Sequence, residues 1–153
     1  MIISSIINKE KISINSRIKI LWTPSNKEFE NFVSKLNVDL VQFEQIYYGN
    51  SFANIIVCNN KIDYYNQCFN LSRKLHLPVL LIDHNVKNPL FDNEKIKAYD
   101  YFPCMHHVCI SKAISDSWSL NNTQILSYNH QDKDNINIWQ NLLYQISKKV
   151  FKI

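Results

Sequence analysis

The segment Leu77-Pro78-Val79-Leu80-Leu81-Ile82-Asp83-His84 is an apolar run that ends abruptly in a carboxyl and an imidazole side chain. A second segment, His107-Val108-Cys109-Ile110-Ser111, has the same form. Aliphatic and β-branched runs of this length are typical of strands buried on both faces, as in a parallel sheet between helices. Ligands of such sheets bind outside the carboxyl ends of the strands. We therefore expect Asp83, His84 and Ser111 to face a ligand.

Strand and helix signals alternate along the rest of the chain. Strands are expected at 17–22, 39–43, 53–58, 79–82, 105–110 and 123–127, and helices at 27–36, 62–75, 112–119 and 136–150. Weaker signals predict an edge strand or hairpin in 1–16, a turn at 47–50 and a short helix at 92–99. This alternation predicts an α/β fold, a single Rossmann-like domain over 1–153 with a mainly parallel sheet flanked by helices.

Composition excludes several classes of function. The 153 residues, with 46% apolar and 20% charged side chains, fit one globular domain. The net charge of +4 comes from scattered basic residues, so we expect no dedicated nucleic-acid binding. Gly49 is the only glycine, which rules out both a G-x-G-x-x-G fingerprint and a Walker A loop. P-loop nucleotidases and standard dinucleotide oxidoreductases are thereby excluded, and we expect no cofactor.

The cysteines and the apolar runs indicate the compartment. No run approaches the ~18 apolar residues of a membrane span, and the first residues do not form a signal peptide, so no membrane partner is expected. Three of the four cysteines, Cys58, Cys68, Cys104 and Cys109, lie in apolar surroundings, where cysteine acts as a small hydrophobic residue. We expect reduced thiols and a cytoplasmic location.

The hexapeptide Cys104-Met105-His106-His107-Val108-Cys109 has the residue types of a metal site. Strand alternation places Cys104 and His106 on one face, however, and His107 and Cys109 on the other. Structural zinc sites also pair one Cys-x-x-Cys knuckle with a second, distant pair of ligands, and no such pair is evident. Four ligands cannot converge from this strand, so we expect no metal site there.

Several strand-end motifs occur in a characteristic order. They are Lys19-Ile20-Leu21-Trp22, Tyr48-Gly49, Asn54-Ile55-Ile56-Val57-Cys58-Asn59, Leu77-Pro78-Val79, Asp83-His84, His107-Val108-Cys109-Ile110-Ser111 with Trp118, and Ile125-Leu126. In this order, over Ile18 to Tyr128, the chain resembles the N-terminal half of GT-B glycosyltransferases. The nearest likeness is to the group-1 type found in bacteria, large DNA phages and viruses. For a viral source, this resemblance implies that the protein is located in the host cytoplasm.

The resemblance also implies where a ligand would lie. In the family, the position of His84 lies near the donor sugar, and that of Ser111 ends the strand before the crossover to the second domain. Two departures concern activity. The second Rossmann domain, which holds the nucleotide diphosphate in the family, is expected to be missing here. The Gly-rich loop often found near the first strand is replaced by Thr23-Pro24-Ser25.

His84, Ser111 and Asn59 are the predicted ligand-binding residues, and each also has a purely structural interpretation. His84 either hydrogen-bonds a sugar hydroxyl or acts as a base, or it is a solvated strand end. Asp83 points to the opposite face and is not expected to orient the His84 ring. Ser111 is expected to cap the helix at 112–119, with a further ligand role left open. Asn59 serves either turn geometry or sugar recognition.

Two functions from different classes follow from the sequence. The first is a glycosyltransferase-like N-terminal domain that binds a sugar acceptor or nucleotide sugar and needs a protein partner or self-association for catalysis. The alternative is a non-catalytic binding or protein-interaction module that retains the fold. A flavodoxin-like or response-regulator-like domain is disfavoured, because the first strand does not end in an acidic pair. No catalytic residue is identified, and whether the chain is an enzyme stays open.

Overall fold

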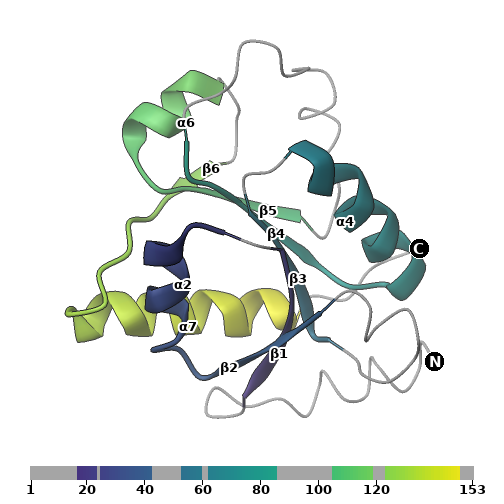
Figure 1. Ribbon diagram of the computed structural model, residues 1–153, viewed down its shortest axis with the longest axis horizontal. Coiled ribbons are helices and arrows are strands. Elements are labelled where there is room, and N and C mark those ends of the chain that lie inside the picture. Colours follow the sequence, from purple (N-terminus) through teal and green to yellow (C-terminus); the bar gives the residue numbers. More distant parts are fainter. Residues whose placement is uncertain are drawn as a thin grey trace.

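The chain folds around one parallel sheet. The computed structural model describes residues 17–23, 25–42, 53–59, 62–85, 105–118 and 123–148. Within them, six strands pair in parallel and helices cover both faces (Figure 1). In chain order the elements are β1 (Ile18–Trp22), α2 (Lys27–Val33), β2 (Val38–Val41), β3 (Ile55–Asn59), α4 (Ile62–Leu75), β4 (Val79–Asp83), β5 (Met105–Cys109), α6 (Lys112–Trp118), β6 (Thr123–Ile125) and α7 (Lys133–Ser147). The predicted α/β fold with a Rossmann-like parallel sheet is confirmed.

Element boundaries shift where hydrogen bonds, rather than hydrophobic spacing, decide them. The last helix begins at Lys133, before the predicted residue 136, because the Asp132 carboxylate caps it by accepting from the N–H groups of Asp134 (3.0 Å) and Asn135 (3.4 Å). Hydrophobic spacing does not detect this polar first turn. The segments 1–16, 47–50 and 92–99, each with a predicted element, lie outside the described residues.

The first helix ends earlier than predicted. Asn26 caps its start, accepting from the Phe29 N–H at 2.7 Å. The helix ends at Val33 instead of Leu36, because the chain tightens there: the Leu36 N–H bonds the Val33 carbonyl at 2.9 Å. Leu36 stays buried in this tighter turn. Because Leu36 continues the apolar spacing of the helix, the predicted helix was three residues too long.

The strand order reverses next to β1. The order across the sheet is β2-β1-β3-β4-β5-β6, so the chain leaves β1 to one side and returns on the other. The helices that follow β1 and β3, α2 and α4, pack against opposite faces of the sheet. In open α/β sheets such a reversal is the point where ligands bind. The carboxyl ends of β1 and β3 flank it here.

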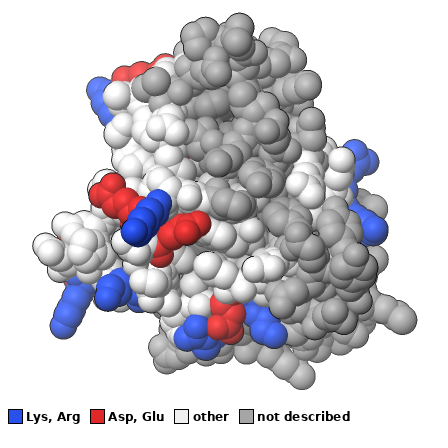
Figure 2. Space-filling model, viewed as in Figure 1, with Lys and Arg blue, Asp and Glu red and all other residues white. Residues whose placement is uncertain are grey.

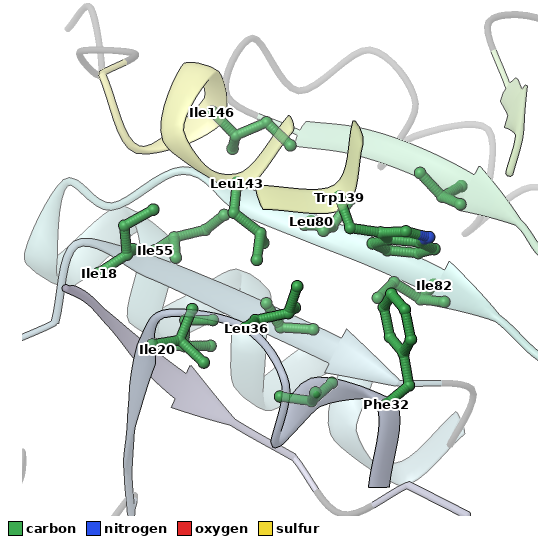
Figure 3. Packing of buried hydrophobic residues seen from close by; sticks show 14 of the residues in the cluster. Ile18, Ile20, Phe32, Leu36, Ile55, Leu80, Ile82, Trp139, Leu143 and Ile146 are labelled. Carbon is green, nitrogen blue, oxygen red and sulfur yellow. The ribbon is translucent and has the colours of Figure 1, made fainter. Parts of the chain in front are cut away.

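Each face of the sheet has its own hydrophobic core. We call the sides the α2/α7 face and the α4/α6 face, after the helices that cover them. Figure 3 shows Trp139, Leu143 and Ile146 of α7 packed over the strands of the α2/α7 face. The α2/α7 core contains Ile18, Ile20, Phe29, Phe32, Val33, Leu36, Val38, Ile55, Val57, Leu80, Ile82, Val108, Trp139, Leu143 and Ile146. The α4/α6 core contains Leu21, Ala53, Ile56, Cys58, Cys68, Leu71, Leu77, Val79, Leu81, Cys109 and Ile114.

The central strands are sealed on both sides. Every residue of β3 and β4 is buried, as the continuous apolar runs predicted. Burial of each Leu, Ile or Val side chain contributes about 1.5–3 kcal/mol to folding. Polar residues in these strands therefore occur only at their carboxyl ends, where Asn59 closes β3 and Asp83 closes β4.

The surface gives two further observations. Among the described residues no helix has the length and apolar character needed to span a bilayer. On the face drawn in Figure 2, basic and acidic side chains lie beside one another rather than in a single-sign stripe.

Candidate functional site

Four polar residues meet at the carboxyl edge of the sheet, beside the strand-order reversal. Thr23 and Ser25 follow β1, Asn59 ends β3, and His84 follows β4. Nε2 of His84 lies 3.0 Å from Oδ1 of Asn59 and 3.3 Å from Oγ of Ser25. The structure thus brings together two of the predicted site residues, His84 and Asn59, at the sheet edge where ligands were expected.

Thr23 fixes the position of Asn59. The Thr23 hydroxyl donates to the Val57 carbonyl (3.2 Å) and accepts from the Asn59 N–H (2.7 Å). The Asn59 side-chain amide in turn donates to the Thr23 carbonyl at 2.7 Å. Both residues are buried, with exposed fractions of 0% and 1%. Asn59 is therefore held rigidly between β1 and the ring of His84.

This arrangement determines the tautomer of His84. A backbone carbonyl only accepts hydrogen bonds, so the atom of Asn59 that faces the Thr23 carbonyl must be the amide nitrogen. The other terminal atom, Oδ1, is an acceptor and faces Nε2 of His84. Nε2 must then carry the proton, and Nδ1 of the neutral ring carries a free lone pair.

Burial keeps the imidazole neutral. The ring packs against Phe29 of α2, with 4.7 Å between ring centroids. Desolvation lowers the pKa of His84 to about 4, although the negative charge of Asp83 acts in the opposite direction. Nδ1 is itself buried and has no hydrogen-bond partner in the part of the chain that the structure describes. Nδ1 of His84 is therefore a fixed, uncharged and buried acceptor.

The loop after β1 is held by a carboxylate. Glu30 of α2 accepts from the Ser25 N–H at 3.1 Å and from the indole N–H of Trp22 at 3.3 Å. These bonds place Ser25 beside the His84 ring. Thr23 and Ser25 were not predicted as site residues from the sequence. Their polar side chains directly after the first core strand are the signal that could have marked them as site residues.

Asp83 lies on the opposite face from His84, as predicted. It is fully buried on the α4/α6 face and hydrogen-bonds Nε2 of His107, which is 3% exposed. Asp83 therefore faces no ligand at the sheet edge, which corrects the initial expectation drawn from its strand-end position. The physical reason is strand alternation, because successive side chains of β4 leave the sheet in opposite directions.

Ser111 acts as the predicted helix cap. Its hydroxyl accepts from the Ile114 N–H at 3.3 Å, at the start of α6. It follows β5, which lies across β4 from β3 and from Asn59. Its predicted role toward a ligand stays a prediction.

The His-Cys hexapeptide divides between the two faces as strand alternation requires. His106 contacts Oε1 of Gln124 at 2.9 Å, whereas His107 is buried against Asp83. Cys104 lies outside the described residues. Nε2 of His107 also lies 3.9 Å from Sγ of Cys109. The sequence alone did not predict that Asp83 would lie beside His107 and Cys109 on the α4/α6 face.

The described cysteines are buried free thiols: Cys58, Cys68 and Cys109. Burial raises the pKa of Cys109 to about 12, with a further contribution from the charge of Asp83. Burial also raises the pKa of Cys58 well above its ordinary value, helped by a hydrogen bond with Cys68. Both groups are protonated at neutral pH, which makes them poor nucleophiles.

The Asp83, His107 and Cys109 group is not a catalytic triad. In a triad the carboxylate and the nucleophile bind opposite nitrogens of the imidazole. Here both the carboxylate and the thiol face the same atom, Nε2.

Fold and site together define a parallel α/β domain with a neutral, rigidly held histidine at its strand-order reversal. Comparisons with protein-family models, curated proteins and solved structures find no match to this chain.

Proposed function

We propose that this chain is a glycosyltransferase-like binding domain, which holds a sugar or nucleotide sugar at the carboxyl edge of its sheet. Nδ1 of His84 accepts a hydrogen bond from a hydroxyl of that ligand. The observation that carries the proposal is the buried, unpartnered Nδ1 of a ring whose other nitrogen is committed to Asn59. The resemblance of the strand-end motifs to GT-B enzymes gives the ligand class.

The chemistry of Nδ1 restricts what it can bind. A buried acceptor without a partner costs about 1–3 kcal/mol, so a ligand that supplies a donor gains that amount. Fully ionised phosphate and carboxylate groups have no proton to donate, whereas a sugar ring offers several hydroxyl donors. A hydroxyl-bearing ligand thus fits this nitrogen better than an anion.

The electrostatics favour binding over base catalysis by His84. A general base works best when its pKa lies near the operating pH. The pKa of about 4 makes His84 a weak base, and its ring partner is the neutral amide of Asn59 rather than a carboxylate. The proposed domain therefore recognises the ligand. In the family that the chain resembles, the donor diphosphate lies mainly on a second Rossmann domain. We propose that the groups that bind the donor diphosphate lie outside these 153 residues, in a partner chain or a further segment.

Isothermal titration calorimetry tests the proposal, with UDP-glucose, GDP-mannose, maltose and free UDP as probes. We expect saturable binding of at least one sugar-bearing probe. The variant His84→Phe keeps an aromatic ring beside Phe29 and is expected to weaken binding at least about tenfold, the equivalent of ~1.4 kcal/mol. His130→Ala removes an exposed imidazole and serves as the matched control.

Two results would overturn the proposal. One is the absence of heat with every probe, alone and with candidate partner chains. The other is equal affinity in the wild type and His84→Phe. If that variant does not fold, ¹⁵N NMR of the wild-type imidazole replaces it. The unprotonated Nδ1 signal must then move upfield on addition of sugar, and a stationary signal contradicts the proposal.

A further inference from the structure

A second group of chemically able side chains lies on the α4/α6 face, away from His84. Asp83 ends β4, and the register pairs it directly with Cys109 of β5. His107 precedes Cys109 by two residues and so lies on the same face. One ligand atom from each residue, an oxygen, a nitrogen and a sulfur, lies within 4.8 Å of the other two. All three residues are buried, with exposed fractions of 0–3%.

The geometry points to a binding site for a divalent zinc-like cation, held by the Asp83 carboxylate, Nε2 of His107 and Sγ of Cys109. Carboxylate, imidazole and thiolate are the three ligand types that Zn²⁺ takes in proteins. The sequence analysis expected no metal in this segment, because four ligands could not converge from one strand. His106 lies on the other face, as expected, but His107 and Cys109 gain a third ligand, Asp83, from the neighbouring strand.

The sulfur–nitrogen distance is close to that of a tetrahedral ion, whereas the Asp83 carboxylate must move away from Nε2 of His107 to admit the ion. Zn–S and Zn–N bonds of about 2.3 and 2.0 Å place sulfur and nitrogen roughly 3.5 Å apart in a tetrahedral site. The observed separation of Sγ and Nε2 is 3.9 Å. Asp83 and His107 hydrogen-bond directly, and a bound cation replaces that bond with two bonds to itself.

The charges also balance. A carboxylate and a thiolate carry two negative charges, the imidazole is neutral, and a divalent cation makes the sum zero. A site without net charge suits the apolar core of the α4/α6 face, where an unpaired ion would cost several kcal/mol. Binding releases the Cys109 thiol proton to solvent, because the thiolate is the form that coordinates zinc. The proton between Asp83 and Nε2 of His107 moves to Nδ1 of the same ring or to solvent, so that both atoms can bind the cation.

Cobalt substitution tests the site on the full chain. Co²⁺ is added to protein freed of metal and kept reduced. We expect about one ion per chain, with visible bands of tetrahedral Co²⁺ and a near-ultraviolet thiolate-to-cobalt transition. Cys109→Ser replaces one sulfur by oxygen, and it is expected to lose that transition and to bind Zn²⁺ at least about tenfold more weakly.

Two matched controls accompany this variant. Cys68→Ala removes another buried thiol of the same core, and His106→Ala removes the neighbouring imidazole on the opposite face. Both are expected to retain the cobalt spectrum. The inference is overturned if the wild type shows no thiolate-to-cobalt transition, or if the transition persists in Cys109→Ser.

X-ray absorption at the zinc edge gives a second measurement that needs no variant. We expect a shell of four ligands that includes sulfur. A six-coordinate shell of oxygen and nitrogen alone indicates an adventitious ion and contradicts the site. The result is independent of the sugar-binding proposal, which concerns the opposite face of the sheet.

Discussion

Asp83 and His84 are neighbours in the chain but belong to different chemical environments. Asp83 enters the α4/α6 face and hydrogen-bonds His107 in the core. His84 turns to the α2/α7 side and bonds the amide of Asn59, with its second nitrogen unpartnered among the described residues. The comparison separates two uses of histidine. His107 has a carboxylate partner inside the fold, whereas His84 has a neutral partner and one acceptor without a partner among the described residues.

The largest effect is expected from Asp83→Ala, which tests the structural side of this comparison. The substitution leaves His107 buried without its partner. Removal of one member of a buried pair costs about 3–5 kcal/mol, and we expect the free energy of unfolding in urea to fall by that amount. Asp39→Ala, which removes an exposed carboxylate paired with Arg17, is the control and should leave the urea midpoint nearly unchanged. Similar stability of the two variants would show that the buried pair contributes nothing.

A smaller, pH-dependent effect is expected from His84. Its pKa is about 4 in the folded chain against an ordinary value of 6.5, so between these values the unfolded chain binds more protons. The free energy of unfolding therefore rises with pH through this window, and the contribution is complete above it. Lowering the pH from 7 to 4 should cost the wild type up to about 2–3 kcal/mol more than His84→Gln.

Urea titrations of both chains at several pH values measure this difference, since the other titrating groups are common to both. NMR of the His84 ring gives a direct check, because the imidazole should stay neutral down to about pH 5. Parallel stability curves for the wild type and His84→Gln would contradict the assignment of His84 as a desolvated neutral histidine.

The smallest effect is expected from Ser111→Ala, which separates a cap from a ligand contact. Loss of the hydrogen bond to the Ile114 N–H should cost about 1 kcal/mol of stability. Lys112→Ala alters the next, exposed residue and should have little effect. If Ser111→Ala also lowers the affinity for a sugar probe by more than the His130→Ala control does, Ser111 belongs to the binding site as well.

The sequence predicted the layers of this fold because its hydrophobic runs are unusually complete. The strands β3 and β4 are apolar on both faces, which only a covered parallel sheet satisfies. Helix ends were less predictable, because caps such as Asp132 act through hydrogen bonds that leave no mark in hydrophobic spacing. The strand order was also beyond a single sequence, since it depends on pairings between distant segments.

The candidate site was predicted in outline but not in its connections. Strand alternation alone separated Asp83 from His84, and the position after β4 singled out His84. The two contacts that define the chemistry, Thr23 with Asn59 and Asp83 with His107, join residues that are far apart in the sequence. Sequence spacing carries no information about such contacts, so the fixed tautomer of His84 and the cluster of Asp83, His107 and Cys109 emerged only from the structure.

The uniform burial of β4 has a consequence for how the chain finds its correct alignment. Val79 to Ile82 are all apolar and all buried, so a shift of this strand by one residue would still place aliphatic side chains on both faces. The shift would, however, turn the Asp83 carboxylate toward the ring of Phe29 and carry the His84 imidazole into the opposite core. The polar pair at the end of β4 thus disfavours a one-residue shift, because the shifted sheet would bury the Asp83 carboxylate without its partner.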